Sequence, residues 1–355
     1  MRWSLTEEQE MLTDALQDWL DHDADSAHVR SMLGDAGPAA IESALADGGW
    51  SGIGVAEDDG GQGGGLTELC LLAEALAAHA APSSAWLATA LALPLLPAGD
   101  DALTAALEGG AIVALAARSD RPLDARPTVS ADGGRLSGEV PLVLGGDRAG
   151  LLVVPGTGAG GTALHVVEAD ADGVAVEPLR LLDGGRTAAT VRFDGAAARP
   201  LELEADAALA RAALRGAVLV AADALGAATR LRELAVEYAG QRTQFGSPIG
   251  AFQAVKHAAA TMLVDEEAAR SLVHYAAEAV DVGAPDAALA AAAAKAQATA
   301  AAARSADAAL TLHGAIGYTW EHDLQLFYKR TKLDLSLFGT PAVWNERIAE
   351  GLDLR

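Results

Sequence analysis

The sequence predicts an α+β fold, in which a helical N-terminal part and a helical C-terminal part flank a β part. Three observations predict it: apolar residues at helical spacing near the N-terminus, short Val- and Leu-rich runs in the middle, and helical spacing again in the C-terminal part. A chain of 355 residues is also long for one compact domain. We therefore expect an N-terminal helical domain at residues 1–108, a middle β domain at 109–205 and a C-terminal helical domain at 206–355.

The N-terminal helices are predicted from spacing and from end signals. The helical spacing begins near Ser4, and Thr6 followed by Gln9 fits a capping box at the start of the first helix. The glycine-rich stretch Gly60–Gly65 then breaks the pattern before a second predicted helix, Thr67–Ala80.

The middle of the chain changes to short apolar runs that Gly, Asp and Pro separate. Turn residues at intervals of about ten are typical of an antiparallel sheet or a small barrel. The expected strands are Ala111–Leu115, Val140–Leu144, Leu151–Val154, Leu164–Val167, Val174–Val176 and Thr190–Phe193. In the C-terminal part, Pro285 and Asp286 predict the start of a long Ala-rich helix that ends near Gly314.

The charge of the chain excludes some classes of partner. The formal net charge is −24, which repels nucleic-acid phosphates and anionic lipid surfaces, so we expect neither as a partner. We find no uncharged apolar run of transmembrane length, and Met1–Arg2 does not begin a secretion signal. We therefore expect a cytoplasmic protein, in which the single cysteine, Cys70, is a buried helix residue.

Two C-terminal segments carry specific motifs. The first is Arg242-Thr243-Gln244-Phe245-Gly246 with Phe252-Gln253, and the second runs from His313-Gly314 through Gly317-Tyr318 to Phe338-Gly339-Thr340. Together they resemble the acyl-CoA dehydrogenase family. The resemblance implies a middle antiparallel β domain, a C-terminal four-helix bundle, FAD as cofactor and dehydrogenation of an acyl-CoA thioester between its α and β carbons.

The motifs also imply which residues bind the cofactor. Arg242 offers a planar fork of donors that suits a pyrophosphate, and Gln253 can pair with a polar nucleotide edge. A lone arginine could instead bond a helix C-terminus or a surface carboxylate. The full expected set is Arg242, Gln244, Phe245, Phe252, Gln253, His313, Gly314, Gly317 and Thr340.

The catalytic base that the resemblance implies is absent from both expected positions. The family reaction needs a carboxylate to take the proton next to the thioester. Counting without gaps places Phe338 at one position where the family holds a glutamate and Gly216 at the other, so no catalytic residue is assigned. Asp223, Glu321 and Glu346 are weaker candidates for a replacement base.

Two further features of the sequence bear on the chemistry. Of the motif that lines the flavin ring in the family, only Ser119-Asp120 remains, and the ring-packing tryptophan motif is not visible near residues 143–146. The histidines lack metal-ligand spacing, so we expect no metal site. Instead we expect His313 to pack at a subunit interface or to contact the cofactor.

Tyr318-Thr319-Trp320-Glu321-His322 resembles one subgroup, the heteromeric dehydrogenases that shorten steroid side chains. We therefore expect a base-lacking subunit that completes the FAD site of a paralogous partner in an α2β2 heterotetramer, with an acyl-CoA substrate and a flavoprotein as electron acceptor. Two alternatives remain open: an active homo-oligomer with an unrecognised base, and a flavin-free scaffold of the same fold.

Overall fold

The computed structural model describes residues 5–33 and 38–352. The chain divides into two compact units. The bundle unit comprises Met1–Ser31, Cys70–Ala81 and Ala217–Arg355, and the sheet unit comprises Met32–Leu69 and Pro82–Gly216. The boundaries of the three expected domains stay a prediction. Met1–Ser4, on which the expectation about a secretion signal partly rests, lie outside the described residues.

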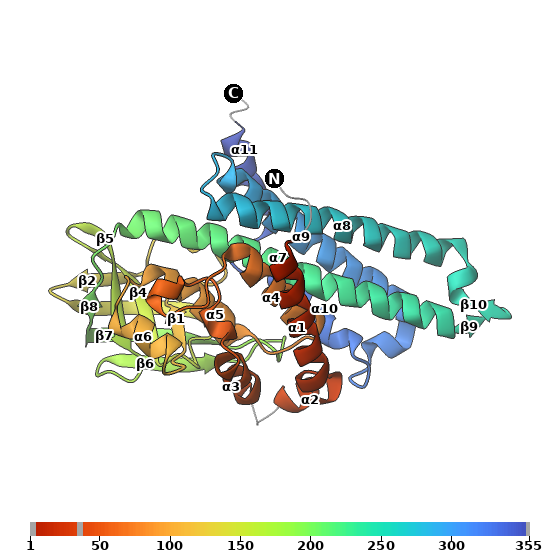
Figure 1. Cartoon of the computed structure of the whole chain (residues 1–355), viewed down its shortest axis with the longest axis horizontal. Coiled ribbons are helices and arrows are strands. Elements are labelled where there is room, and N and C mark those ends of the chain that lie inside the picture. The colour runs from red at the N-terminus through yellow and green to blue at the C-terminus, as the bar shows by residue number, and fades with distance from the viewer. Residues whose placement is uncertain (1–4, 34–37, 353–355) are drawn as a thin grey trace. The chain divides into compact units, whose positions relative to one another are not determined.

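The helices and strands follow the expected order of helical, β and helical parts (Figure 1). The helices are α1 (Glu7–Asp23), α2 (Ser26–Met32), α3 (Ala39–Asp47), α4 (Leu66–Ala78), α5 (Ser84–Ala92), α6 (Asp101–Leu107), α7 (Ala205–Gln241), α8 (Gln253–Asp281), α9 (Ala287–His313), α10 (Leu324–Asp334) and α11 (Pro341–Gly351). The strands are β1 (Val113–Leu115), β2 (Val129–Asp132), β3 (Arg135–Leu144), β4 (Leu151–Gly158), β5 (Gly161–Glu168), β6 (Val174–Leu179), β7 (Ala188–Ala197), β8 (Arg199–Pro200), β9 (Thr243–Gln244) and β10 (Ser247–Pro248).

The predicted helix ends are confirmed closely. The Thr6 hydroxyl accepts a hydrogen bond from the Gln9 amide at 3.2 Å, and the Gln9 side chain accepts one from the Thr6 amide at 3.0 Å. This is the predicted capping box, and α1 begins directly after it. The helix predicted over Thr67–Ala80 is α4, and Cys70 on it is buried. The long Ala-rich helix is α9, which begins directly after Pro285–Asp286.

The sheet unit contains one large sheet, with strand order β6-β7-β3-β2-β4-β5-β8 and β1 beside β4. Five of the six predicted runs lie wholly on its strands, and of the run Ala111–Leu115 only Val113–Leu115 forms a strand, β1. Most pairings are antiparallel as expected, but β1 and β2 each pair with β4 in parallel, so the sheet is mixed. Among the described residues the end strands β6 and β8 pair with different neighbours, which corresponds to an open sheet rather than a closed barrel.

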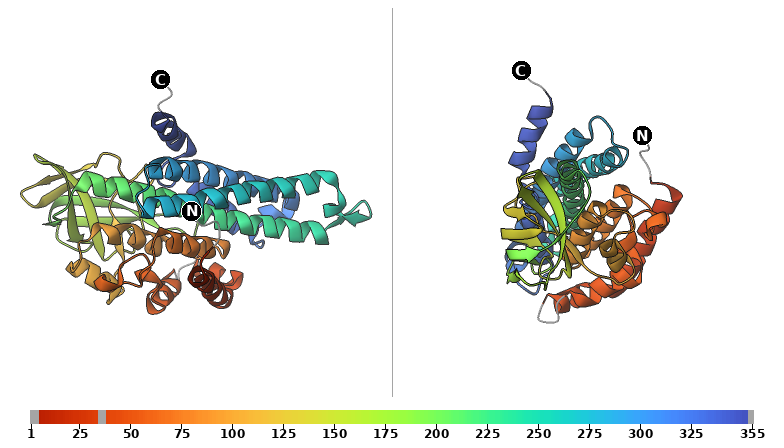
Figure 2. Two further views of the ribbon diagram at one scale, coloured as in Figure 1. Left: turned by 45° about the horizontal axis from the view of Figure 1, so that its top comes forward. Right: turned by 90° about the vertical axis from the view of Figure 1, so that its left-hand side faces the viewer.

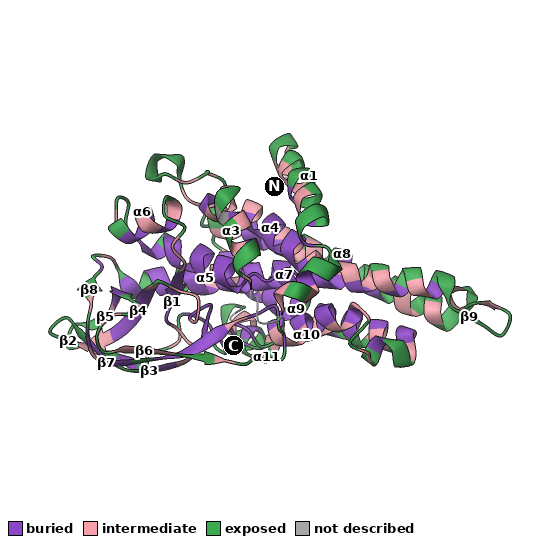
Figure 3. Ribbon diagram, turned by 90° about the horizontal axis from the view of Figure 1, so that it is seen from below, coloured by how far each residue is buried: buried purple, intermediate pink, exposed green. Residues whose placement is uncertain are grey.

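The apolar core of the sheet unit lies against α5, whose residues are all buried (Figure 3). Val140, Leu152 and Val191 from three strands meet Ala88 of α5 in this core. The contact is close at Gly145, where a Cβ atom would lie 3.0 Å from the Ser84 carbonyl oxygen. Gly145 also has φ 64°, so a side chain there would be both crowded and strained.

The bundle unit packs its helices through small side chains. In this unit α8 and α9 run side by side (Figures 1 and 2), and alanines make up most of the buried residues of α9. Gly226 of α7 approaches α4 so closely that a Cβ atom would lie 2.1 Å from the Glu74 carbonyl oxygen. Within the described ranges, no helix combines the length and the apolar character that crossing a bilayer requires.

Candidate functional site

An exposed β-hairpin carries the first motif. It joins α7 to α8 and pairs Gln244 with Ser247 across a two-residue turn (Figure 1). Both turn residues have positive φ, 53° at Phe245 and 79° at Gly246, which is the type I′ pattern. Glycine adopts this conformation freely, but phenylalanine is strained in it. The Phe245 side chain is nevertheless 93% exposed, with its ring edge-on to Phe252 at 6.1 Å between centroids. The tip of the hairpin thus carries an exposed aromatic residue in a strained backbone conformation.

Arg242 lies at the base of this hairpin. Its backbone is hydrogen-bonded on both sides, whereas its guanidinium bonds none of the described residues. Its amide donates to the Tyr238 carbonyl and its carbonyl accepts from the Ile249 amide, both at 2.8 Å. The guanidinium forms no ion pair and no hydrogen bond with the described residues, and Arg242 is exposed. The alternative that it bonds a helix C-terminus or a carboxylate of this chain is therefore not observed. In a chain of net charge −24, this guanidinium remains available to an external anion.

The two glutamines of the motif differ. The side-chain amide of Gln244 donates to its neighbour's carbonyl, the Thr243 oxygen, at 2.8 Å. Gln253 is exposed at the first position of α8, and Phe252 is the N-cap residue of that helix. Gln253 is therefore the better placed of the two to meet a ligand from outside the chain.

His313 forms the centre of a ring cluster at the end of α9. Its ring stacks on Tyr238, with centroids 4.5 Å apart and planes inclined by 23°, and meets the His322 ring edge-on at 4.7 Å. The Nδ1 atom donates to the Ala309 carbonyl at 2.7 Å, which leaves Nε2 as the acceptor of a neutral ring. Nε2 is buried and has no hydrogen-bond partner among the described residues.

The surroundings of His313 favour the neutral ring. Burial lowers the pKa of His313, the hydrogen bond to the Ala309 carbonyl opposes this effect, and the neighbouring His322 adds to the lowering. The structure shows a buried ring with one unused acceptor. The expectation that His313 packs at a subunit interface or contacts the cofactor stays a prediction. Sequence reasoning missed Tyr238; its position one helical turn before Arg242 was the available signal.

The turn after α9 combines one open and one crowded glycine. Gly314 has φ 63° and no atom within 4 Å of where its Cβ would lie, so one side of it faces open space. At Gly317 a Cβ would lie 3.0 Å from the Cβ of His313, so this glycine keeps the turn compact. The structure therefore explains why glycine stands at both positions, and only Gly314 leaves room for a ligand.

Arg30 of α2 fixes the chain that follows this turn. Its guanidinium donates to the Trp320 carbonyl at 2.6 Å, the Glu321 carbonyl at 3.0 Å and the Asp323 carboxylate at 2.6 Å. These bonds order the segment that carries His322. Sequence reasoning missed Arg30 because the residues that it joins lie about 290 positions apart.

Phe338, at one of the two expected base positions, is a buried residue in a rigid turn. It is 2% exposed and has φ 55°, in the left-handed region. Its carbonyl accepts a hydrogen bond from the Trp344 indole at 3.0 Å. The Lys295 ammonium donates to the Asp334 carbonyl at 2.9 Å and the Gly339 carbonyl at 3.0 Å, on either side of Phe338. The turn is thus held by polar contacts around an apolar side chain.

Thr340 and Gly216 are the two expected residues that remain to be described. Thr340 is exposed at the N-cap of α11. Gly216, the other expected base position, is buried on α7. Neither Phe338 nor Gly216 offers a proton acceptor in its side chain.

Each candidate for a replacement base is either bonded to an arginine or exposed to solvent. Asp223 receives two hydrogen bonds from the Arg330 guanidinium, at 2.7 and 2.6 Å, and the two side chains are 2% and 1% exposed. A carboxylate bound in this way is stabilised as the anion and is a weak proton acceptor. Glu321 and Glu346 are exposed to solvent, whereas the reaction needs a desolvated carboxylate.

The remnant of the ring-binding motif has a structural role in this chain. The buried Ser119 hydroxyl accepts from the Leu144 amide at 3.1 Å, and the Ser119 amide donates to the Leu142 carbonyl. Asp120 pairs with Arg118 at 2.7 Å. Ser119 therefore ties the segment after β1 to β3, and Asp120 forms an ion pair within that segment.

The residues present fit the nucleotide half of FAD. Arg242 supplies an unpaired guanidinium for a pyrophosphate, His313 an unused acceptor for a hydroxyl, and Gly314 an open approach. The assignment of these and the other expected contacts to FAD stays a proposal.

Comparison with known proteins agrees with the fold. The model of the acyl-CoA dehydrogenase N-terminal domain matches residues 6–107, and that of the C-terminal domain matches residues 206–352. Acyl-CoA dehydrogenase FadE34 of Mycobacterium tuberculosis is 32% identical over 287 residues, which are 81% of this chain. The match spans only 38% of the length of FadE34.

Two solved structures are similar over nearly the whole chain. The Tcur3481-Tcur3483 steroid ACAD variant has a TM-score of 0.87 at 27% identity and covers 98% of each chain. The ChsE4-ChsE5 complex from Mycobacterium tuberculosis has a TM-score of 0.89 at 24% identity and covers 100% of each chain, which shows the shared fold. The chain therefore belongs to the acyl-CoA dehydrogenase family, a family of oxidoreductases that bind FAD.

Proposed function

We propose that this chain is the base-lacking subunit of a heteromeric acyl-CoA dehydrogenase and that it completes the FAD site of a paralogous partner. One observation carries the proposal. At the expected base position Phe338 is buried, apolar and held in a rigid turn.

The missing base matters because of the reaction. α,β-Dehydrogenation removes a proton from the carbon next to the thioester, and a desolvated carboxylate must accept it. Bound FAD supplies the acceptor for the hydride that leaves the neighbouring carbon. In this chain Asp223 is engaged by Arg330 and the other candidate carboxylates are exposed. In the proposed complex the partner supplies the base and the pocket for the acyl group.

In the proposed complex, this chain would bind the nucleotide half of FAD. The unpaired Arg242 guanidinium would bind the pyrophosphate, and the unused His313 acceptor would receive a hydroxyl of the nucleotide. The strained and exposed Phe245 would lie against the partner. These residues bind and orient one half of the cofactor, and the acid–base chemistry takes place on the other subunit.

The similarity to a structure named as a steroid ACAD, with two components in its name, supports a bulky, steroid-derived acyl-CoA as substrate. It also supports an α2β2 heterotetramer with a paralogue. We propose a cytoplasmic complex that passes electrons to a second flavoprotein.

Purification tests the proposal. The chain is produced alone and with each paralogous acyl-CoA dehydrogenase of its source, and flavin absorbance, native mass and turnover are measured. We expect a colourless chain alone, and a yellow, active heteromer with one paralogue. A yellow chain that is active by itself would contradict the proposal and favour the homo-oligomer. A chain that stays colourless with every paralogue would favour the flavin-free scaffold.

A further inference from the structure

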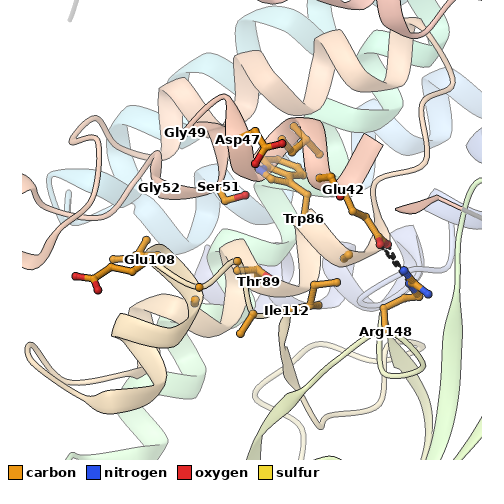
Figure 4. Close-up of a pocket in the computed structure, with 18 of the residues that line it drawn as sticks. Glu42, Asp47, Gly49, Ser51, Gly52, Trp86, Thr89, Glu108, Ile112 and Arg148 are labelled. Atoms are coloured by element: carbon orange, nitrogen blue, oxygen red, sulfur yellow. Dashed lines mark hydrogen bonds and ion pairs between the residues drawn. The ribbon is translucent and has the colours of Figure 1, made fainter. Parts of the chain in front are cut away.

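A cavity of about 480 Å³ lies within the sheet unit (Figure 4). It is bordered by α3, α5, the end of α6 and the segment that leads into β1. None of the expected cofactor residues is among those that line it. Its volume is in the range of pockets that hold small organic ligands.

One part of the cavity wall is apolar, and the rest is lined by polar side chains such as Ser51, Gln62 and Thr89. Leu45, Trp86 and Ile112 line the apolar part together with several alanines and glycines. Leu45 is 2% exposed and Trp86 is 5% exposed, so these side chains belong to the packed interior. The apolar part therefore favours a compact apolar ligand body, because burying apolar surface there removes it from water.

Trp86 also supplies a polar group to this wall. Its indole N–H donates to no other described residue and is not among the buried polar atoms without a partner, so it is open to solvent at the cavity. In Figure 4 the indole is drawn between the labelled side chains of Asp47 and Glu42. A ligand with an oxygen acceptor would satisfy this donor.

The charges at the cavity select against anions. Glu42 is already neutralised by Arg148, with contacts of 2.6 and 3.2 Å between guanidinium nitrogens and carboxylate oxygens (Figure 4). Asp47 and Glu108 are exposed lining residues and remain as two negative charges. A carboxylate or phosphate placed beside these two side chains would be repelled.

From these features we infer that the cavity is a binding site for an uncharged, compact apolar alcohol or ketone. The apolar body packs on Leu45 and Ile112, and the oxygen accepts the hydrogen bond of the Trp86 indole. A hydroxyl could in addition donate to one of the carboxylates at the cavity. This inference does not depend on the proposed role in FAD binding.

Three probes with the same apolar cage test the inference: 1-adamantanol, 1-adamantylamine and 1-adamantanecarboxylate. Binding to the full chain is measured by calorimetry and by the indole N–H resonances of its six tryptophans. We expect 1-adamantanol to bind and to shift one indole resonance, the one that disappears in Trp86→Phe. That variant keeps an aromatic ring but loses the donor, so it should weaken 1-adamantanol binding about threefold to tenfold.

The controls separate hydrogen bonding from charge. Trp320→Phe changes an exposed tryptophan of the bundle unit and should leave the affinity unchanged. The carboxylate should bind at least about tenfold more weakly than the alcohol, and Asp47→Asn with Glu108→Gln should reduce that gap. The inference is overturned if the Trp86 resonance does not respond, if Trp86→Phe binds the alcohol as tightly as the native chain, or if either charged probe binds more tightly than the alcohol.

Discussion

Phe338 combines an apolar side chain with a backbone conformation that phenylalanine adopts at a cost. Its φ of 55° is strained. Hydrogen bonds that Lys295 donates to the Gly339 carbonyl and Trp344 donates to the Phe338 carbonyl hold the turn in this conformation. A carboxylate introduced here would enter a buried position in a chain whose ring-side residues, Ser119 and Asp120, are bonded to the protein itself.

We therefore expect Phe338→Glu to create no robust activity in the chain alone. Turnover is measured with FAD, an acyl-CoA and a dye acceptor, and Phe338→Gln is the isosteric control without a carboxylate. Strong turnover of the Glu variant without a partner would contradict the role of a supporting subunit.

Asp223 illustrates the opposite case, a carboxylate that is present but engaged. Asp223→Asn should lower the free energy of unfolding by about 3–5 kcal/mol, because the buried Arg330 guanidinium loses its charge partner. Urea denaturation measures the change. The matched control is Glu177→Gln, which removes a partner of Arg192 on the exposed surface and should cost less than about 1 kcal/mol. Equal effects of the two substitutions would show that burial does not decide the strength of these pairs.

Single residues also show what the sequence can predict. The lack of a proton acceptor at Phe338 and Gly216 could be predicted from the sequence, because the identity of a side chain decides whether it can accept a proton. The ion pair between Asp223 and Arg330 could not be predicted from the sequence, because the two residues are 107 positions apart and only the fold brings them together.

At the scale of elements, the turn between α10 and α11 depends on the buried amino group of Lys295 on α9. Burial lowers the pKa of Lys295 to about 7, and the charge of Asp334 opposes this shift. Lys295→Met should lower the free energy of unfolding by about 3 kcal/mol, because two buried carbonyls lose their donor.

The pH dependence of this effect has a definite sign. Between pH 7 and the ordinary Lys pKa of 10.5 the folded state has lost the Lys295 proton while the unfolded state retains it. The unfolded state binds more protons, so the contribution of Lys295 to stability rises with pH through this window. Urea denaturation at pH 7 and pH 9 should show the native chain gaining stability relative to Lys295→Met, and a constant difference would refute this account.

Elements with strong local signals were predicted well. The capping box fixed the start of α1, and Pro285–Asp286 marked the start of α9. The strands β2 and β8 were missed because they are short, four and two residues, and most of their residues are not fully buried, so the apolar pattern is weak. The parallel pairing of β1 and β2 with β4 is a property of the connections between strands, which local spacing does not encode.

At the scale of the whole molecule, the proposed role depends on assembly. In the complex with its paralogue, Arg242→Ala should raise the dissociation constant for FAD roughly tenfold to a hundredfold, because one charge-assisted contact is lost. The ratio of flavin to protein after dialysis measures the effect. Arg242→Lys should retain only part of the affinity, since a point charge replaces a fork. Arg211→Ala, at an exposed arginine of α7, is the control. Unchanged flavin content in Arg242→Ala would make Arg242 merely structural.

The order of helical, β and helical parts and the membership in a flavin-binding family could be predicted from the sequence. The ring cluster of Tyr238, His313 and His322 could not, because it joins residues from α7, the end of α9 and the following turn. The cavity beside Trp86 also escaped prediction. It forms between helices and leaves no motif in the order of the residues.

The alanines of α9 have a consequence for how this protein tolerates genetic change. In many cores the damaging substitutions are truncations, which leave cavities. The buried side chains of α9 are mostly single methyl groups, so truncation to glycine removes little and costs about 1 kcal/mol of helix propensity. Enlargement is the greater danger, since one added isopropyl group at Ala291 or Ala302 has no space to occupy. Variation along this helix should therefore be restricted by an upper limit on residue volume.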